Sequence, residues 1–556
     1  MITSWVETKG DRQVLTINGN QQENLAYITY LPDNGRFVDF AEAGYKLYSA
    51  CLFFGTNKMN EHSGFDVPGK GIFDDAAPDF SEFDRVVHQI LAACPDAYIF
   101  PRVNVSAGRQ WELENSDELC YEGTTKFPER KRVCFASEKW AQLVESQLTT
   151  LIAHVESSDY GAHIIGYQIA GGNTEEWFAF NDRGGKGKRS DEAFKDYVKA
   201  GGEDSEASYQ RFLSQIVAER ICRFAAHIKE ETQHRLVVGT FYGYTMEKYN
   251  RGGTHHALRR VLECPDVDFI CSPISYAQLR KAGRDQPYML PLHSLKLHGK
   301  LYFAENDIRT HLSRPVCDNP HYNTPIWFGP EPGETLEILK MHFAKCLING
   351  HALWWFDMWG GWYADPRYMD FMAQAKTLWA AESDDGKSIA QVAVVMDEAA
   401  PSFLDDKDPG LRKVFFDFRE TLGKAAVPLH WYLASDFESI KDRYKAFVLL
   451  KPVDTQWSEI IENSGIPVLS VTPGNCVMTT EHVREFCKSA NVQIYCDHDA
   501  VIYANWKYLF VHTVEAGEQK LNLPANSVLC DCFTDTVFGT TFCAEAGKSY
   551  LFTVSK

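Results

Sequence analysis

Two acidic segments of the chain carry the residue types needed for acid–base and nucleophilic chemistry. Glu305 directly follows one apolar run, and the pair Glu175 and Glu176 follows another. Cleavage of a glycosidic bond uses such a pair, because one carboxylic acid protonates the leaving oxygen while a second carboxylate attacks the anomeric carbon or activates water. We therefore predict Glu305 as the nucleophile and Glu176, or else Glu175, as the acid/base.

A third segment is rich in indole rings and lies after another apolar run. It includes the adjacent Trp354 and Trp355, followed by Trp359. Aromatic faces supply stacking surfaces for the apolar face of a sugar ring, and we predict Trp355 and Trp359 as substrate-binding residues. Since side chains alternate along a strand, one of the adjacent pair should point inward and the other toward the helices.

Polar residues at two further strand ends complete the candidate site. Arg102 and Asn104 are two residues apart, so they share one face of a strand. We expect them to bind substrate hydroxyls or to orient Glu305, and we expect Asn173 to contact the substrate as well. A structural alternative exists for Asn173, because Asn followed three residues later by Glu176 also matches a helix capping box.

The elements that must position these residues alternate between apolar strand-like runs and amphipathic helical stretches. This order predicts an α/β fold, a (β/α)8 TIM barrel, in which the active site lies at the carboxyl ends of the strands. Glu305 then follows the seventh strand, and Glu175 and Glu176 follow the fourth. The eight expected strands are residues 26–30, 46–54, 97–105, 164–169, 236–241, 269–273, 300–304 and 352–356.

The remaining chain predicts two smaller domains. We assign residues 1–385 to the barrel, with a short β decoration in residues 1–22, and place a polar break near residue 385. Residues 386–500 then read as a doubly wound α/β domain, and residues 501–556 as a small all-β, sandwich-like domain. No glycine-rich turn follows the first strand of the α/β domain, so we expect no nucleotide or flavin cofactor.

Composition excludes several classes of partner. A formal net charge of −19 argues against nucleic acid, which needs a basic surface. No apolar run is long enough for a membrane span, and the amino terminus lacks a signal-peptide pattern. The 15 scattered cysteines predict reduced thiols of a cytoplasmic protein. His255, His256 and His311 have no third ligand at useful spacing, so we expect no metal.

Several of these segments resemble those of clan A glycoside hydrolases. The residues that carry the resemblance are Ile164-Ile165-Gly166-Tyr167-Gln168-Ile169, the elbow at residues 173–176 and Glu305. In that clan the acid/base follows strand four and the nucleophile ends strand seven. The chain is most similar to the family 42 type of β-galactosidase, with further likeness at residues 427–433 and 510–512 and in residues 517–523.

The resemblance implies more than the residues alone. It implies that the α/β domain is flavodoxin-like and assembles trimers, and that Tyr276 is similar to the tyrosine that hydrogen-bonds the nucleophile. One departure concerns the acid/base, which the clan usually places directly after an asparagine. Here Thr174 and Glu175 intervene, so both glutamates stay open, and we favour Glu176 because it precedes Trp177.

The sequence as a whole predicts a retaining exo-β-glycosidase that acts on a small carbohydrate, with β-galactosides as the favoured substrates. Specificity for β-mannosides, β-glucosides or β-glucuronides on the same barrel is the first alternative. A uronic acid substrate would need a cation, which Arg102 or Arg309 could supply. The alternative of another class is a sugar-binding or assembly protein that has lost catalysis.

Overall fold

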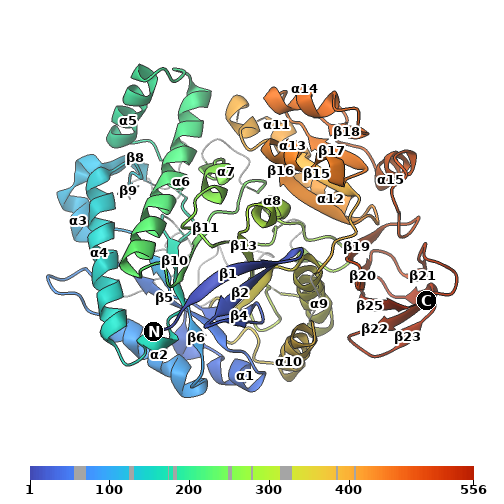
Figure 1. The fold of residues 1–556 in the computed structure, drawn as a ribbon, viewed down its shortest axis with the longest axis horizontal. Helices are drawn as coiled ribbons and strands as arrows, with labels where there is room; N and C mark the ends of the chain where they lie inside the picture. Colours follow the sequence, from blue (N-terminus) through green and yellow to red (C-terminus); the bar gives the residue numbers. More distant parts are fainter. Residues whose placement is uncertain are drawn as a thin grey trace.

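A closed barrel of eight parallel strands forms the largest part of the molecule (Figure 1). The eighth strand pairs in parallel with both the seventh and the first, which closes the sheet. The predicted TIM barrel is therefore confirmed. Its strands are β4 (Leu25–Thr29), β5 (Leu47–Phe53), β6 with β7 (Tyr98–Ile99 and Arg102–Asn104), β10 (Gly166–Ala170), β11 (Val237–Phe241), β12 (Phe269–Pro273), β13 (Leu301–Asn306) and β14 (Ala352–Phe356).

The computed structural model describes most of the chain. The described residues are 1–55, 70–123, 131–172, 174–178, 185–247, 253–276, 280–313, 329–382, 386–405 and 408–555. The descriptions below are limited to these ranges.

Helices cover the outside of the barrel, and their ends follow local sequence signals. Ser137 caps the helix α4 by accepting a hydrogen bond from the Trp140 amide. The helix α9 begins with Pro332 and stops at Gly350, whose φ of 63° suits a residue without a Cβ. The main covering helices are α2 (Ser81–Ala93), α4 (Glu138–Ser157), α6 (Glu206–Glu231), α9 (Pro332–Asn349) and α10 (Pro366–Ala380).

A small antiparallel sheet closes the amino end of the barrel. It consists of β1 (Ser4–Lys9), β2 (Arg12–Ile17) and β3 (Asn20–Gln21), and Asn18 and Gly19 form its second turn with positive φ. Ser4 donates its amide to the Arg235 carbonyl at 2.8 Å, just before β11 begins. The opposite, carboxyl end of the barrel is therefore where a substrate can enter.

A parallel four-stranded sheet follows the barrel in sequence. Its strands are β15 (Val392–Met396), β16 (Leu429–Leu433), β17 (Ala446–Leu450) and β18 (Val468–Val471), in the order β16-β15-β17-β18. This order, second-first-third-fourth, is that of a flavodoxin-type sheet. The helices α12 (Phe418–Gly423), α14 (Gln456–Glu462) and α15 (Thr480–Ser489) accompany it.

The carboxyl-terminal part of the chain is built from antiparallel sheets (Figure 1). A five-stranded sheet contains β19 (Ala500–Ala504), β20 (Tyr508–Thr513), β25 (Ser549–Ser555), β22 (Val528–Asp531) and β23 (Val537–Phe538). A two-stranded sheet pairs β21 (Gly517–Lys520) with β24 (Thr541–Ala544). The fold class predicted from the sequence is thus confirmed, while the limits of the three domains stay predictions.

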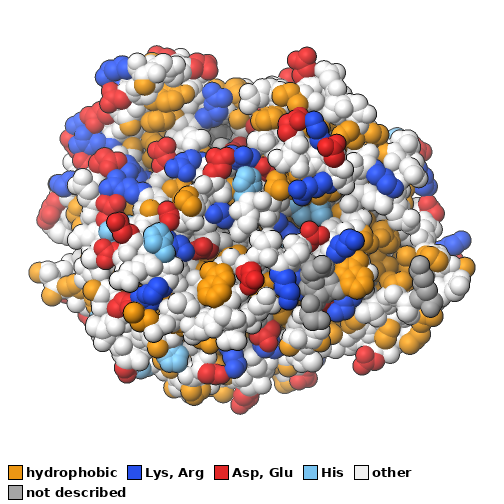
Figure 2. All heavy atoms as spheres, viewed as in Figure 1, with side chains coloured by type: hydrophobic (Ala, Val, Ile, Leu, Met, Phe, Trp, Pro, Cys, Tyr) orange, Lys and Arg blue, Asp and Glu red, His pale blue; other side chains and the backbone are white. Residues whose placement is uncertain are grey.

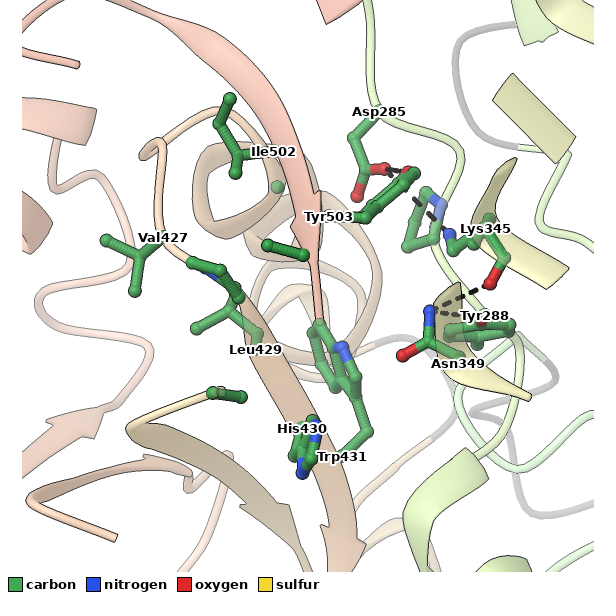
Figure 3. Close-up of a pocket in the computed structure, with 15 residues that line it drawn as sticks. Asp285, Tyr288, Lys345, Asn349, Val427, Leu429, His430, Trp431, Ile502 and Tyr503 are labelled. Atoms are coloured by element: carbon green, nitrogen blue, oxygen red, sulfur yellow. Dashed lines mark hydrogen bonds and ion pairs between the residues drawn. The ribbon is translucent and has the colours of Figure 1, made fainter. Parts of the chain in front are cut away.

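The barrel meets both carboxyl-terminal parts around a small cavity (Figure 3). Its volume of about 30 Å³ holds roughly one water molecule. Lys345 of α9 is buried there, 4.2 Å from the centre of the Tyr288 ring, and Tyr503 of β19 donates to Asp285. The second contact joins the barrel to the antiparallel sheets, and the space is too small for a substrate.

The visible surface mixes charges of both signs. Figure 2 shows Lys and Arg side chains interspersed with Asp and Glu side chains over the face it presents. Among the described residues, no helix combines the length and the apolar character needed to cross a membrane.

Candidate active site

Glu305 lies at the carboxyl end of β13, between Pro273 of β12 and Trp354 of β14. Its Oε2 accepts hydrogen bonds from Arg102 Nη2 at 2.8 Å and from Trp354 Nε1 at 3.3 Å. Only 5% of its side chain is exposed. Burial raises the pKa of Glu305 to about 7, and the positive charge of Arg102 opposes that rise. Glu305 is therefore an enclosed carboxylate held by two donors.

Arg102, at the start of β7, links the two sides of the site. Its guanidinium is fully buried and lies 4.7 Å from the Phe241 ring centre and 5.2 Å from that of Trp354. Besides contacting Glu305, it donates from Nη1 to Glu175 Oε2 at 3.3 Å. The structure thus places Arg102 against Glu305, as expected if Arg102 orients Glu305.

The elbow after β10 has an unusual backbone. Thr174, Glu175 and Trp177 have φ values of 54°, 63° and 62°, in the left-handed region that side-chain-bearing residues rarely adopt. The Trp177 amide donates to the Gly171 carbonyl at 2.7 Å, and its indole donates to Thr240 at 3.1 Å. Such conformations persist where surrounding structure enforces them, and they concentrate at functional sites. The elbow sends Glu175 and Glu176 to different surroundings.

Glu175 points into the protein interior. Its side chain is fully buried, and its Oε2 accepts hydrogen bonds from Tyr30 at 3.0 Å and from Arg102. Its Oε1 is buried without a hydrogen-bond partner. Burial raises the pKa of Glu175 to about 7, against the opposing charge of Arg102. Among the described residues, the Glu175 side chain thus presents no exposed surface that a substrate could contact.

Glu176 is half-buried and held by hydroxyl groups. Its Oε2 accepts from Thr174 at 2.6 Å and its Oε1 accepts from Tyr244. His255 contacts the Glu176 carbonyl through Nε2 at 2.7 Å, which gives this histidine a role in supporting the elbow. The negative charge of Glu176 contributes to the raised pKa of Glu305, so the two carboxylates lie within electrostatic range.

Other predicted residues have local partners. Asn104 is buried, and its Oδ1 accepts the Ser106 amide at 2.9 Å. Tyr276 donates to Asp307 Oδ2 at 3.0 Å, so the described hydroxyl bond goes to Asp307 and not to Glu305. Asn173, predicted to bind substrate, lies outside the described residues.

The tryptophans after β14 correct one prediction. Trp354, not Trp355, points toward Glu305. Trp355 is fully buried on the helix side, where its indole donates to Tyr45 at 2.8 Å and its ring packs near Phe371 of α10. The prediction that Trp355 stacks on a sugar is wrong, because alternation along β14 turns Trp354 toward the barrel interior and Trp355 toward the helices. Trp359 is 3% exposed, and its ring meets that of Trp362 edge-on.

Comparison with known proteins gives matches in structure only. No protein-family model matches the chain, and no curated protein matches it in sequence. The β-galactosidase from the psychrophilic Marinomonas ef1 matches with a TM-score of 0.63 at 12% identity, covering 95% of this chain and 99% of that one. The cold-adapted β-galactosidase from Rahnella sp. R3 matches with a TM-score of 0.63 at 12% identity. The match covers 95% of this chain and 98% of that one.

A catalytic mutant of a GH42 β-galactosidase from G. stearothermophilus matches over almost the whole of both chains. The TM-score is 0.63 at 10% identity, with 99% of this chain and 100% of that one covered. The chain has the fold of the GH42 β-galactosidases. This likeness extends beyond the barrel to the sheets that follow it, as the coverage requires.

Within this fold, two acidic residues near the site were missed by sequence reasoning. Asp307 is fully buried and binds Tyr276, Arg280 and Arg309. It lies two residues after Glu305, and its negative charge contributes to the raised pKa of Glu305. The spacing of two residues after an apolar run is the sequence signal that could have indicated this proximity. Asp357 accepts the Tyr27 hydroxyl at 2.9 Å and two loop amides, and it fixes the loop after β14.

Proposed function

We propose that the chain is a retaining exo-β-glycosidase that acts on β-galactosides. The observation that carries this proposal is the enclosed Glu305 at the end of β13, held by Arg102 and Trp354, with a second carboxylate, Glu176, after β10. The fold shared with solved β-galactosidases supports the substrate class.

In the first step, Glu305 attacks the anomeric carbon as Glu176 gives its proton to the leaving glycosidic oxygen. This forms a covalent glycosyl ester on Glu305 and releases the aglycone. The donors Arg102 and Trp354 both bind Oε2, which leaves Oε1 as the attacking atom. They also hold the carboxylate in a fixed orientation, which lowers the entropic part of the barrier.

In the second step, Glu176 takes a proton from water, and the water oxygen attacks the anomeric carbon. The ester bond to Glu305 breaks, the sugar leaves with its original configuration, and both glutamates return to their starting states. Two inversions at one carbon therefore give net retention.

Accessibility supports Glu176 over Glu175 as the acid/base. Glu176 is half-buried, whereas Glu175 is fully buried with its Oε2 committed to Tyr30 and Arg102. A general acid must come within hydrogen-bond reach of the leaving oxygen, and Glu175 could do so only after the site had opened.

A panel of aryl β-glycosides, with product stereochemistry followed by NMR, tests the proposal. We expect the galactoside to be hydrolysed fastest and the first-formed product to be the β anomer. Faster hydrolysis of a mannoside, glucoside or glucuronide would replace the substrate assignment. Measurable sugar binding with hydrolysis of none would favour a non-catalytic sugar-binding protein.

Two variants test the residue roles. Glu305→Gln should lower kcat by at least about 10³-fold with the fold retained, and substantial residual turnover would exclude Glu305 as the nucleophile. Glu176→Ala should recover activity with azide on a substrate that has a good leaving group, because azide needs no base. Azide rescue of Glu175→Ala instead would transfer the acid/base role by one residue.

Assembly and location extend the proposal. We propose a trimer formed through the flavodoxin-like sheet and a cytoplasmic location, both on the resemblance and the cysteine usage. Light scattering that gives a monomer would remove the first of these.

A further inference from the structure

The proposed reaction assigns no role to Glu175, although this carboxyl group is fully buried beside Arg102. Its side chain has no exposed surface, and its Oε1 has no hydrogen-bond partner. Buried polar atoms are almost always paired, so an unpaired one calls for an explanation. Its Oε2, by contrast, receives both the Tyr30 hydroxyl and Arg102.

The charges around Glu175 do not balance if every carboxyl group is ionised. Among the described residues, Arg102 is the one cation that forms an ion pair with Glu175 or Glu305. The groups that face Glu175 are Arg102 from β7, Tyr30 after β4, Cys51 of β5 and Glu305 of β13. One buried guanidinium therefore stands between two carboxylates, and a second negative charge would lack a counter-charge.

The geometry decides which of the two carboxyl groups keeps the charge. Glu305 has the shorter contact with Arg102, 2.8 Å against 3.3 Å, and it also receives the Trp354 indole. Glu175 has the unpaired Oε1, which can hold a proton while Oε2 keeps both of its donors. Burial raises the pKa of both groups to about 7, which favours one proton on the pair, and the contacts determine which group holds it.

We propose that Glu175 is a positioning residue that holds a proton on Oε1 and accepts a hydrogen bond from Arg102 through Oε2. The positive charge of Arg102 is then balanced by the Glu305 carboxylate alone. The inference rests on the proposed function. Loss of the proton from Glu175 to solvent would make it compete with Glu305 for Arg102. Part of the alkaline decline in activity therefore belongs to Glu175.

Kinetics against pH tests the role. Glu175→Gln keeps a neutral group that accepts from Arg102, so the alkaline inflection should move to higher pH than in wild type, and kcat should fall less than in Glu175→Ala. Glu175→Ala removes the anchor and should lower kcat on the order of 100-fold, since small misplacements of reacting groups have effects of that size. An unchanged pH profile in Glu175→Gln would overturn the inference.

Infrared difference spectroscopy tests the proton without relying on activity. Wild type minus Glu175→Gln should show the C=O stretch of a neutral carboxylic acid at mildly acidic pH, shifted in D2O and lost on the alkaline side. Glu337→Gln, at a buried glutamate of α9, is the matched control and should leave this band and the pH profile unchanged. Absence of the band overturns the inference even if the enzyme hydrolyses galactosides. A wild type that hydrolyses no glycoside overturns the proposed function whatever the spectrum.

Discussion

The substitution Glu175→Gln should make the protein more stable, and by an amount that depends on pH. Burial raises the pKa of Glu175 from 4.5 to about 7 in the folded protein. Because one pKa unit corresponds to about 1.4 kcal/mol, the folded state loses about 3 kcal/mol of stability through this group at alkaline pH. The side chain is fully buried, so solvent does not screen this effect.

The sign follows from proton binding. Folded Glu175 holds its proton more tightly than the unfolded chain does, so its contribution is complete below about pH 4.5 and is lost as pH rises through about 7. Glutamine does not titrate. The gain of Glu175→Gln over wild type should therefore be near zero at about pH 4.5 and should approach about 3 kcal/mol at about pH 8.

Thermal unfolding of both proteins, followed by circular dichroism over a pH series, measures this difference. We expect the midpoint of the variant to rise above that of wild type as pH increases. A difference that is the same at acidic and alkaline pH, or that shrinks with rising pH, would refute the reasoning. Glu337→Gln controls for the exchange of a carboxylate for an amide at another buried position.

Four further substitutions each remove or weaken identified hydrogen bonds. Trp354→Phe removes the indole that donates to Glu305 and should lower kcat/KM about 10-fold. Trp355→Phe removes a hydrogen bond to Tyr45 on the helix side, so it should leave kcat unchanged and lower the unfolding midpoint. Asp357→Asn weakens a buried acceptor of three hydrogen bonds and should destabilise the fold by about 1–3 kcal/mol in chemical denaturation, with an unchanged midpoint as the contrary result. Tyr244→Phe removes a hydroxyl group that donates to Glu176, so it should shift the pH dependence of kcat and leave KM nearly unchanged. A change in KM without a shift in the pH dependence of kcat would contradict this.

The barrel and its strand ends could be predicted from the sequence because buried parallel strands read as continuous apolar runs. The seventh expected run, residues 300–304, lies within β13, Leu301–Asn306, apart from its first residue. Once eight such strands close into a barrel, their carboxyl ends meet at one rim. The proximity of Glu305, Arg102 and the elbow follows from topology, without any knowledge of side-chain contacts.

The direction of individual side chains could not be predicted in the same way. Alternation required that one of Trp354 and Trp355 face the barrel interior. Which of the two does so depends on the register of β14 against β13, in which Trp354 pairs with Glu305. At the elbow, positive φ at Thr174 and Glu175 breaks the alternation that a strand would impose. Sequence spacing alone therefore left both glutamates open, and only the folded elbow separates the buried Glu175 from the half-buried Glu176.

The surroundings of the arginines also bear on the sugar that the site accepts. A uronic acid needs a cation that can reach its carboxylate, and Arg102 and Arg309 are the candidates from the sequence. Arg102 is fully buried and donates to Gln168, Tyr30, Glu175 and Glu305, so its charge is already used within the protein. Arg309 is 7% exposed and paired with Asp307. Binding a glucuronide through either of these two arginines would require breaking its buried pair with Glu305 or Asp307, which leaves that carboxylate uncompensated at a cost of about 3–5 kcal/mol. A neutral sugar requires no such rearrangement of Arg102 or Arg309, so we expect neutral β-glycosides to be favoured over β-glucuronides by a factor of at least about 100.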